Sequence, residues 1–229
     1  MKTQRVLTLV HRHLVPPADT EGIDILNAPW KMEYDVVETL RELGHEVLPL
    51  GVQDDLGVVR GAIEQFTPTV VFNLLESFDD VTTFDMNVVS YLELMKVPYT
   101  GCNPRGLLIA RDKALSKQLL AYHRIPVPDF EVFRIGRPIR RPKRLPFPLI
   151  VKSLTQEASI GISQASVVDT DDKLKERVAF IHASIGTAAI VERYVDGREL
   201  YVGILGNQAL QAFPVWELFF TNMPEGAKR

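Results

Sequence analysis

The chain has 229 residues, 46% of them hydrophobic and 24% charged, with a formal net charge of −3. This composition is typical of a globular protein with one large or two modest domains, and it excludes fibrous and disordered classes. The slight acidity gives no general attraction to nucleic acid or to an anionic membrane, so neither is expected as a partner. A single cysteine, Cys102, excludes an internal disulfide. The apolar run Val6–Val10 is too short for a signal peptide or a membrane span, so we expect a cytoplasmic protein.

Strands and helices are predicted to alternate along the first part of the chain. The expected order is a strand over Val6–Val10, a helix over Met32–Leu43 ending at Gly44, a strand over His45–Leu50, a helix over Leu56–Phe66 and a strand over Thr69–Leu74. Such alternation predicts a parallel sheet covered on both faces. These sheets bind ligands at the carboxyl ends of their strands, here the loops 11–15 and 74–80.

The segment Thr82–Met95 gives the clearest helical pattern of the chain. Thr82 and Asp85 resemble a capping box at its start. An apolar stripe that is expected to be core follows at helical spacing: Phe84, Val88, Val89, Leu92 and Met95. Further helix starts are predicted at Asn103 and at Asp112.

Hairpins and one helix are predicted in the second part of the chain. Between the strand Phe130–Phe133 and the next strand lies the basic, proline-rich segment Arg134–Pro148. No aromatic residues alternate with its charges, so a solvated connection is favoured over a binding patch. The later expected elements are a strand over Ala165–Val168, a helix over Thr170–Ala183, a strand over Ala188–Val191, and a hairpin that pairs Glu199–Leu205 with Ala209–Val215 through Gly206-Asn207.

The stretch Phe147–Ser163 combines a short apolar strand, Lys152 and a loop of small residues. The β-prone run 149–151 predicts a buried strand that delivers Lys152. Small side chains in the loop Thr155–Ser163 leave backbone amides able to close around phosphate oxygens. Two interpretations stay open at this point: a grip for a triphosphate, or a solvated lysine beside an ordinary turn.

Five motifs in this order resemble the ATP-grasp ligases, nearest to the D-alanine–D-alanine ligase type. They are Pro98-Tyr-Thr-Gly-Cys-Asn-Pro104, Asp112-Lys-Ala-Leu-Ser-Lys117, Phe147-Pro-Leu-Ile-Val-Lys152, Glu157-Ala-Ser-Ile-Gly-Ile162 and Val191-Glu-Arg-Tyr-Val-Asp-Gly-Arg-Glu199. The resemblance implies an α/β fold: an N-terminal parallel α/β (pre-ATP-grasp) domain over residues 1–105, then an incomplete α+β ATP-grasp domain over residues 106–229. It also implies a ligase that phosphorylates a carboxylate with ATP, after which an amine forms the amide.

The resemblance further implies a nucleotide contact for individual residues of this chain. Lys113 resembles the lysine that reaches the phosphates from the linker side, and Lys152 resembles the strand lysine near the α-phosphate and adenine. The other implied contacts are Glu157, Ala158, Ser159 and Gly161 in the lid over the phosphates, Glu192, Tyr194 and Val195 at the hinge beside adenine, and Glu199 on the ribose hydroxyls. A turn at Asp196-Gly197 is expected to let Glu199 face the same cleft as Glu192.

Two departures from the family pattern shape the expected function. The segment His11–Pro17 replaces the glycine-rich, acid-containing motif of true D-alanine–D-alanine ligases, which implies a substrate other than D-alanine. The family's Mg²⁺ carboxylates lie in its C-terminal half, so Mg²⁺ ligands are expected beyond residue 229. Past Glu199 the chain has only the carboxylate side chains of Glu217 and Glu225, with Pro224 between them.

We therefore expect a fragment that binds ATP weakly and does not join its small carboxylate and amine substrates. Exposed Phe213, Trp216, Phe219 and Phe220 are expected to favour association, and a homodimer is possible. A nucleotide-binding module without ligase activity is the main alternative. A plain α/β domain that binds a sugar or an amino acid is the third.

Overall fold

The computed structural model describes residues 2–223. The chain forms two compact units, Met1–Asp112 and Lys113–Arg229. The helix that Asn103 opens thus belongs to the first unit, whereas the domain boundary between residues 105 and 106 remains a prediction. Among the described residues, no helix has both the length and the apolar character needed to cross a membrane.

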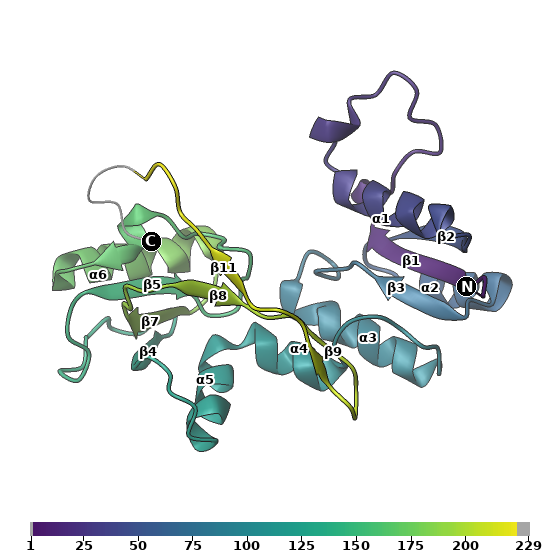
Figure 1. Cartoon of the computed structure of the whole chain (residues 1–229). Helices are drawn as coiled ribbons and strands as arrows, with labels where there is room; N and C mark the ends of the chain where they lie inside the picture. The colour runs from purple at the N-terminus through teal and green to yellow at the C-terminus, as the bar shows by residue number, and fades with distance from the viewer. Residues whose placement is uncertain (1, 224–229) are drawn as a thin grey trace. The chain divides into compact units, whose positions relative to one another are not determined.

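The first unit is a three-stranded parallel sheet with helices, as its alternating sequence predicts (Figure 1). Strand β1 is central, between β2 and β3. The elements are β1 Arg5–His11, α1 Lys31–Glu42, β2 Glu46–Val52, α2 Gly57–Phe66, β3 Val70–Asn73, α3 Asp85–Leu94 and α4 Pro104–Arg111, with 3-10 turns at Arg12–Leu14, Ile25–Asn27 and Thr82–Phe84.

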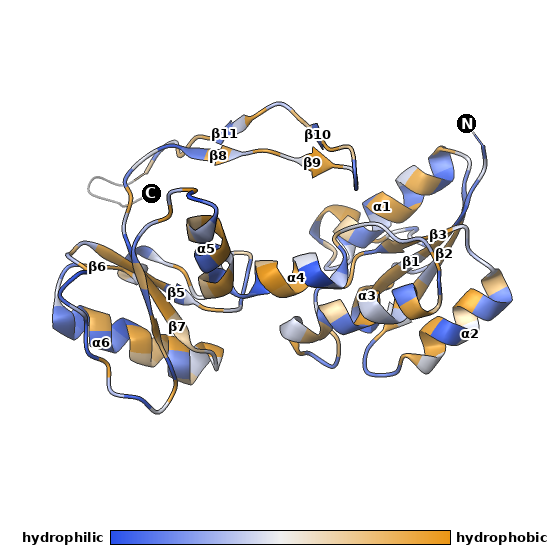
Figure 2. Ribbon diagram, turned by 90° about the horizontal axis from the view of Figure 1, so that it is seen from below, coloured by the Kyte–Doolittle hydropathy of each residue, from blue (hydrophilic) through white to orange (hydrophobic). Residues whose placement is uncertain are grey.

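Burial explains why β1 takes the central position. All five residues of Val6–Val10 are buried, so this strand has apolar neighbours on both faces. Helix α2 contributes Val59 and Ile63 to the same core, and helix α3 contributes Val88 and Leu92. These helices are apolar on one side and polar on the other (Figure 2).

The capping box predicted from Thr82 and Asp85 is wrong. Helix α3 begins at Asp85 after a 3-10 turn, and no side chain caps it. The Asp85 carboxylate instead forms a buried ion pair with Arg111, 2.6 Å apart, and accepts a hydrogen bond from the Met86 amide. Asp85 therefore pairs with Arg111, a residue distant in the sequence, instead of capping the helix. Phe84 is 41% exposed and does not join the core stripe.

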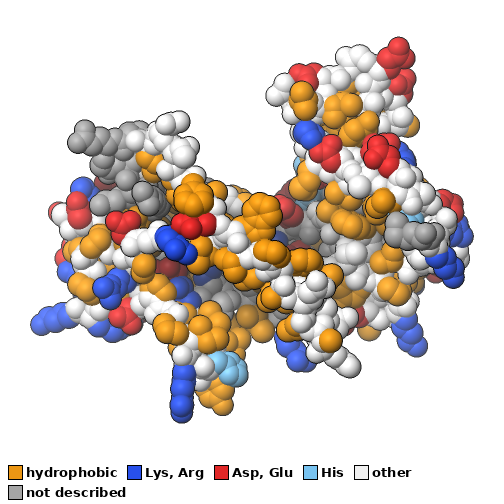
Figure 3. Space-filling model, viewed as in Figure 1, with side chains coloured by type: hydrophobic (Ala, Val, Ile, Leu, Met, Phe, Trp, Pro, Cys, Tyr) orange, Lys and Arg blue, Asp and Glu red, His pale blue; other side chains and the backbone are white. Residues whose placement is uncertain are grey.

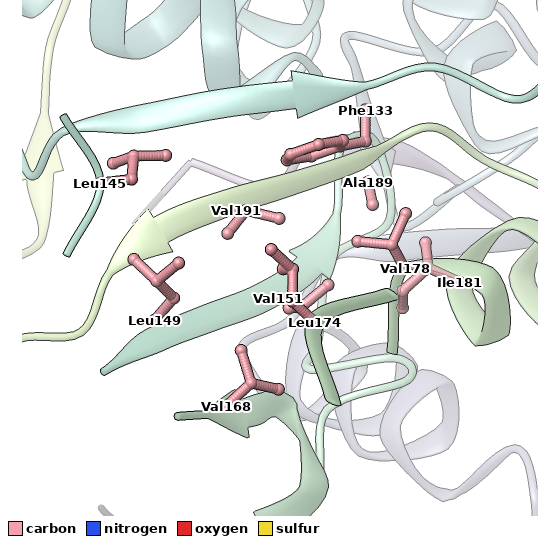
Figure 4. Packing of buried hydrophobic residues seen from close by; sticks show 10 residues of the cluster. All are labelled: Phe133, Leu145, Leu149, Val151, Val168, Leu174, Val178, Ile181, Ala189 and Val191. Atoms are coloured by element: carbon pink, nitrogen blue, oxygen red, sulfur yellow. The ribbon is translucent and has the colours of Figure 1, made fainter. Parts of the chain in front are cut away.

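The second unit contains a four-stranded antiparallel sheet in the order β4-β7-β5-β6. One face of this sheet packs against α6, where Val151 lies beside Leu174 and Ala189 beside Val178 (Figure 4). Its elements are α5 Lys113–Tyr122, β4 Phe130–Phe133, β5 Leu149–Ser153, a 3-10 turn Gln164–Ser166, β6 Val167–Val168, α6 Asp171–Phe180, the π-helical turn η5 Ile181–Ile185 and β7 Ala189–Arg193.

Two of the expected elements of this unit have different limits. The strand expected over Ala165–Val168 is reduced to β6, because Ser163 and Ser166 cap each other across the 3-10 turn. The helix expected over Thr170–Ala183 ends at Phe180 and continues as the π-helical η5. Gly186, with φ 75°, then provides the left-handed conformation that ends it.

The hairpin after β7 is antiparallel as expected, but its strands are interrupted and its returning strand reaches Leu218 instead of ending at Val215. Strand β8 (Glu199–Tyr201) pairs with β11 (Trp216–Leu218), and β9 (Ile204–Leu205) pairs with β10 (Gln211–Ala212). Gly206 turns the chain with φ 121°. Apolar side chains gather on the hairpin surface (Figure 3). The exposed ones are Leu200, Tyr201, Val202, Ile204, Leu205, Leu210, Phe213, Val215, Trp216, Leu218, Phe219 and Phe220.

Candidate functional site

The site is built on the sheet face opposite α6. Side chains alternate along β5 and β7, so the residues between those of the α6 core point to the other face. In the register of these strands Lys152 pairs with Ile190, and Ile150 pairs with Glu192. Lys152 and Glu192 are therefore diagonal neighbours on one face. Their Nζ and Oε2 atoms are 3.3 Å apart.

Glu192 is a buried carboxylate shared by two lysines. The residue is 4% exposed. Its other oxygen, Oε1, lies 3.5 Å from Nζ of Lys117 on α5. Burying a carboxylate is costly unless cations and hydrogen bonds compensate it, and two ammonium groups do so here. Lys117 was not assigned a role from the sequence, although its position four residues after Lys113 places both on one face of a helix.

Lys113 connects the same helix to the small-residue loop. Its Nζ donates a hydrogen bond to the Gln156 carbonyl at 2.5 Å, and its amide lies 3.3 Å from the Leu154 carbonyl. The loop start is held further by the Ser153 hydroxyl, which accepts hydrogen bonds from the amides of Thr155 and Gln156. Helix α5 thus presents one lysine to the loop and one to Glu192.

The loop itself has a sharply turning backbone. Ala158, Ser159 and Gly161 all have positive φ, of 51°, 59° and 73°. Such conformations are costly for residues with a side chain and concentrate at functional sites. Turning backbone of this kind can present successive amides to an anion. Glu157 precedes these residues at the loop tip.

The remaining predicted contacts lie where β7 leaves the sheet. The Tyr194 amide donates to the Pro148 carbonyl at 3.1 Å, and Val195 beyond it is 64% exposed. Glu199 is exposed in β8 and accepts a hydrogen bond from the Tyr201 hydroxyl, which raises the pKa of Tyr201. Glu192 is thus paired with lysines and Glu199 with Tyr201, and the expectation that both glutamates face one cleft remains a prediction.

Carboxylates are scattered in the rest of the second unit. Glu217 pairs with Arg198 at 3.4 Å. The expectation for Pro224 and Glu225 lies outside the described residues. Within residues 2–223, no group of three or more histidine, cysteine, aspartate or glutamate side chains is arranged to hold a metal ion.

In the first unit, the carboxyl ends of β1 and β3 bring the two expected ligand loops together. His11 Nε2 lies 3.4 Å from the Ser77 hydroxyl, and its ring stacks on His13 with centroids 5.6 Å apart. Burial, and then the neighbouring His13, lower the pKa of His11. Glu33, at the first turn of α1, is 2% exposed, and its Oε2 has no hydrogen-bond partner among the described atoms.

Known proteins match both the sequence and the fold. The family model for the D-ala D-ala ligase C-terminus matches residues 119–223. A D-alanine–D-alanine ligase of Gluconobacter oxydans is 31% identical over 174 residues, which cover 76% of this chain and 55% of the relative. The uncharacterized protein y4sG of Sinorhizobium fredii is 34% identical over 200 residues, covering 82% of this chain and 57% of that protein. The chain thus spans a little over half the length of these relatives.

Solved structures show the same fold. The D-alanine–D-alanine ligase of Bacillus anthracis complexed with ATP matches with a TM-score of 0.72 at 18% identity, covering 96% of this chain and 68% of that one. An L-amino acid ligase of Bacillus licheniformis matches with a TM-score of 0.63 at 17% identity, covering 95% and 53%. The fold predicted from the motifs is confirmed. With the parallel first unit, the antiparallel second unit and the ligase relatives in agreement, this chain belongs to the ATP-grasp family of D-alanine–D-alanine ligase-like proteins.

Proposed function

We propose that this chain carries the nucleotide-binding part of an ATP-dependent ligase that joins a carboxylate to an amine. One observation carries the proposal: Lys117 and Lys152 converge on the buried Glu192, while Lys113 holds the start of a loop with left-handed backbone. Three lysines therefore lie close to that loop. Their ammonium groups can neutralise the oxygens of a triphosphate.

Each residue has a defined part in the proposed site. Lys152 and Lys113 neutralise phosphate oxygens, and the loop from Glu157 covers them with Ala158, Ser159 and Gly161. Glu192 orients Lys152 through their ion pair, which fixes an otherwise flexible side chain. At the hinge, Tyr194 and Val195 lie beside the adenine, and Glu199 binds the ribose hydroxyls in place of the Tyr201 hydroxyl.

The proposed chemistry is a phosphoryl transfer followed by an acyl transfer. The substrate carboxylate attacks the γ-phosphorus, the bond to the bridging oxygen breaks, and ADP leaves with that electron pair. The amine then attacks the acyl carbon, phosphate leaves, and the nitrogen loses a proton as the amide forms. Cations that neutralise the spreading charge supply most of the catalysis in such transfers.

Magnesium belongs to the proposal as the partner of ATP, and it would neutralise the β- and γ-phosphates. The described residues do not make a site for it, because no three of their histidine, cysteine, aspartate or glutamate side chains are arranged to hold a metal ion. No step is assigned to the ion. We further propose a cytoplasmic protein that can form a homodimer and whose substrate is not D-alanine, since His11–Pro17 lacks the acid-containing motif.

Calorimetric titration with ATP tests the proposal. A charge-assisted contact contributes about 1.5–3 kcal/mol, so Lys152→Ala is expected to weaken ATP binding by about 10- to 150-fold. The matched control is Lys143→Ala, which removes an exposed lysine of the basic connection and is expected to leave the affinity unchanged. Equal losses in both variants would remove Lys152 from the site. Release of ADP that depends on a carboxylate and an amine substrate would favour a ligase over a nucleotide-binding module.

A further inference from the structure

Arg177 of α6 is a buried cation that the proposed site does not use. The residue is 9% exposed, and burial alone lowers its pKa, with no acid contributing. Its Nε has no acceptor among the described atoms. Burying a cation without an acidic partner is costly, and arginine does not escape the cost by losing its proton. A leucine or methionine would fill the same place more cheaply, so the packing of α6 does not explain this side chain.

The contacts that Arg177 does make point to the small-residue loop. Its Nη2 donates a hydrogen bond to the carbonyl of Gly161. Its guanidinium lies over the ring of Phe180, with Cζ 4.3 Å from the centroid, which fixes the orientation of the fork. Gly161 is thus the single described hydrogen-bond acceptor of this guanidinium.

Gly161 is also where the loop packs most closely on the helix. A Cβ at this position would lie 3.1 Å from both Cγ1 and Cδ1 of Ile185 and 3.5 Å from Cδ1 of Ile181. The residue has φ 73°, which only glycine adopts without strain. The absence of a side chain therefore lets the backbone reach η5 and places its carbonyl within reach of Arg177.

We propose that Arg177 is a positioning residue that anchors the phosphate-covering loop at Gly161. The anchor divides the loop into a base, residues 161–166, that stays on the sheet and a tip, residues 155–160, that closes over phosphates. The Ser163–Ser166 cap holds the base from the other side. The inference deepens the proposed function and rests on it for the role of the tip.

Hydrogen exchange of the whole chain tests the anchor without any ligand. Losing a charged donor corresponds to about a 10- to 150-fold change, so Arg177→Gln is expected to speed exchange at amides 160–163 by about tenfold or more. Arg177→Lys, which keeps the charge, should restore part of the protection. The matched control is Lys173→Gln. Lys173 lies on α6 like Arg177, both residues line a cavity of about 380 Å³, and the change breaks only an exposed ion pair with Asp169. Amides of β5 should exchange alike in every variant.

Unchanged exchange at 160–163 in Arg177→Gln would overturn the anchor. Equal acceleration in β5 would also overturn it, because that result indicates a general loosening of the sheet. A second variant gives an independent check: Gly161→Ala should displace the same carbonyl, so its effect and that of Arg177→Gln should not multiply when combined. Effects that multiply fully would show that the two residues act separately.

Ligand titrations separate this inference from the proposed function. Arg177→Gln is expected to weaken ATP binding about tenfold or more while leaving adenosine binding unchanged, because only ATP has phosphates for the tip. Equal weakening of both ligands would mean a merely structural role. If the unaltered chain bound neither ligand, the proposed function would fail, and the anchor would still be decided by the exchange experiment.

Discussion

The second unit contains two β structures made from similarly apolar residues that differ in what covers them. In the sheet, Leu149 and Val151 are fully buried against α6. In the hairpin, Leu200 is 51% exposed and Trp216 is 73% exposed. Both structures have paired strands, so strand pairing alone does not remove apolar surface from water. A second layer is needed, and the sheet has one in α6.

Core truncation is expected to show the largest difference between these regions. Leu149→Ala removes a fully buried side chain and should lower the free energy of unfolding by about 2–5 kcal/mol. Leu200→Ala makes the same chemical change in the hairpin and should cost at most about 0.5 kcal/mol. Urea denaturation followed by circular dichroism compares them. Similar losses would mean that the hairpin side chains are as well packed as the sheet.

Removing aromatic surface from the hairpin is expected to have an intermediate effect, on association rather than on stability. Replacing Phe219, which is 73% exposed, by serine should weaken self-association by about tenfold or more, since burying such a side chain contributes about 1.5–3 kcal/mol. Tyr122→Ser removes an aromatic side chain that is 81% exposed outside the hairpin and serves as the control. Sedimentation velocity at several concentrations measures both. Association that responds equally to the two changes would contradict a hairpin-specific surface.

The smallest expected effect concerns the ion pair between Arg141, in the basic segment Arg134–Pro148, and Asp171. The hydrogen bond from Arg141 lowers the pKa of Asp171 at the start of α6. A carboxyl with a lowered folded-state pKa stabilises the fold above its unfolded pKa near 4, and this contribution is lost as pH falls through the folded value. Asp171→Asn should therefore slightly reduce stability at pH 7 and flatten its decline below pH 4. Thermal unfolding at several pH values measures the stability of both proteins. An identical decline in stability with falling pH would exclude this ion pair as a source of acid sensitivity.

Local patterns predicted most of the strands and helices correctly, because their signals lie within a few neighbouring residues. The strand that carries Lys152 is one example, and the helix over Thr170–Ala183 is another, although it ends earlier than expected. The cap of α3 was mispredicted because Asp85 pairs with Arg111, 26 residues away. No local pattern contains that partner.

The candidate site also contains residues that local signals identified and residues whose partners are distant in the sequence. The resemblance indicated Lys152 and Glu192, and the structure joins them across neighbouring strands. Lys117 was missed because its partner, Glu192, belongs to a distant strand, although helical spacing from Lys113 offered a signal. The sequence gives no signal for Arg177. Its side chain bonds to the Gly161 carbonyl, and no sequence pattern marks a backbone group that every residue has.

The buried pair of Arg111 and Asp85 has a consequence for exchanging parts between relatives. Arg111, whose guanidinium also donates to the Glu76 carbonyl, is the last residue of α4, and Lys113 is the first residue of α5. Asp112 alone separates a residue that locks the first unit from a lysine that holds the loop. A chimera joined on either side of this short stretch would lose one of the two. We expect recombinants to remain intact only where Arg111 and Lys113 are inherited with their own units.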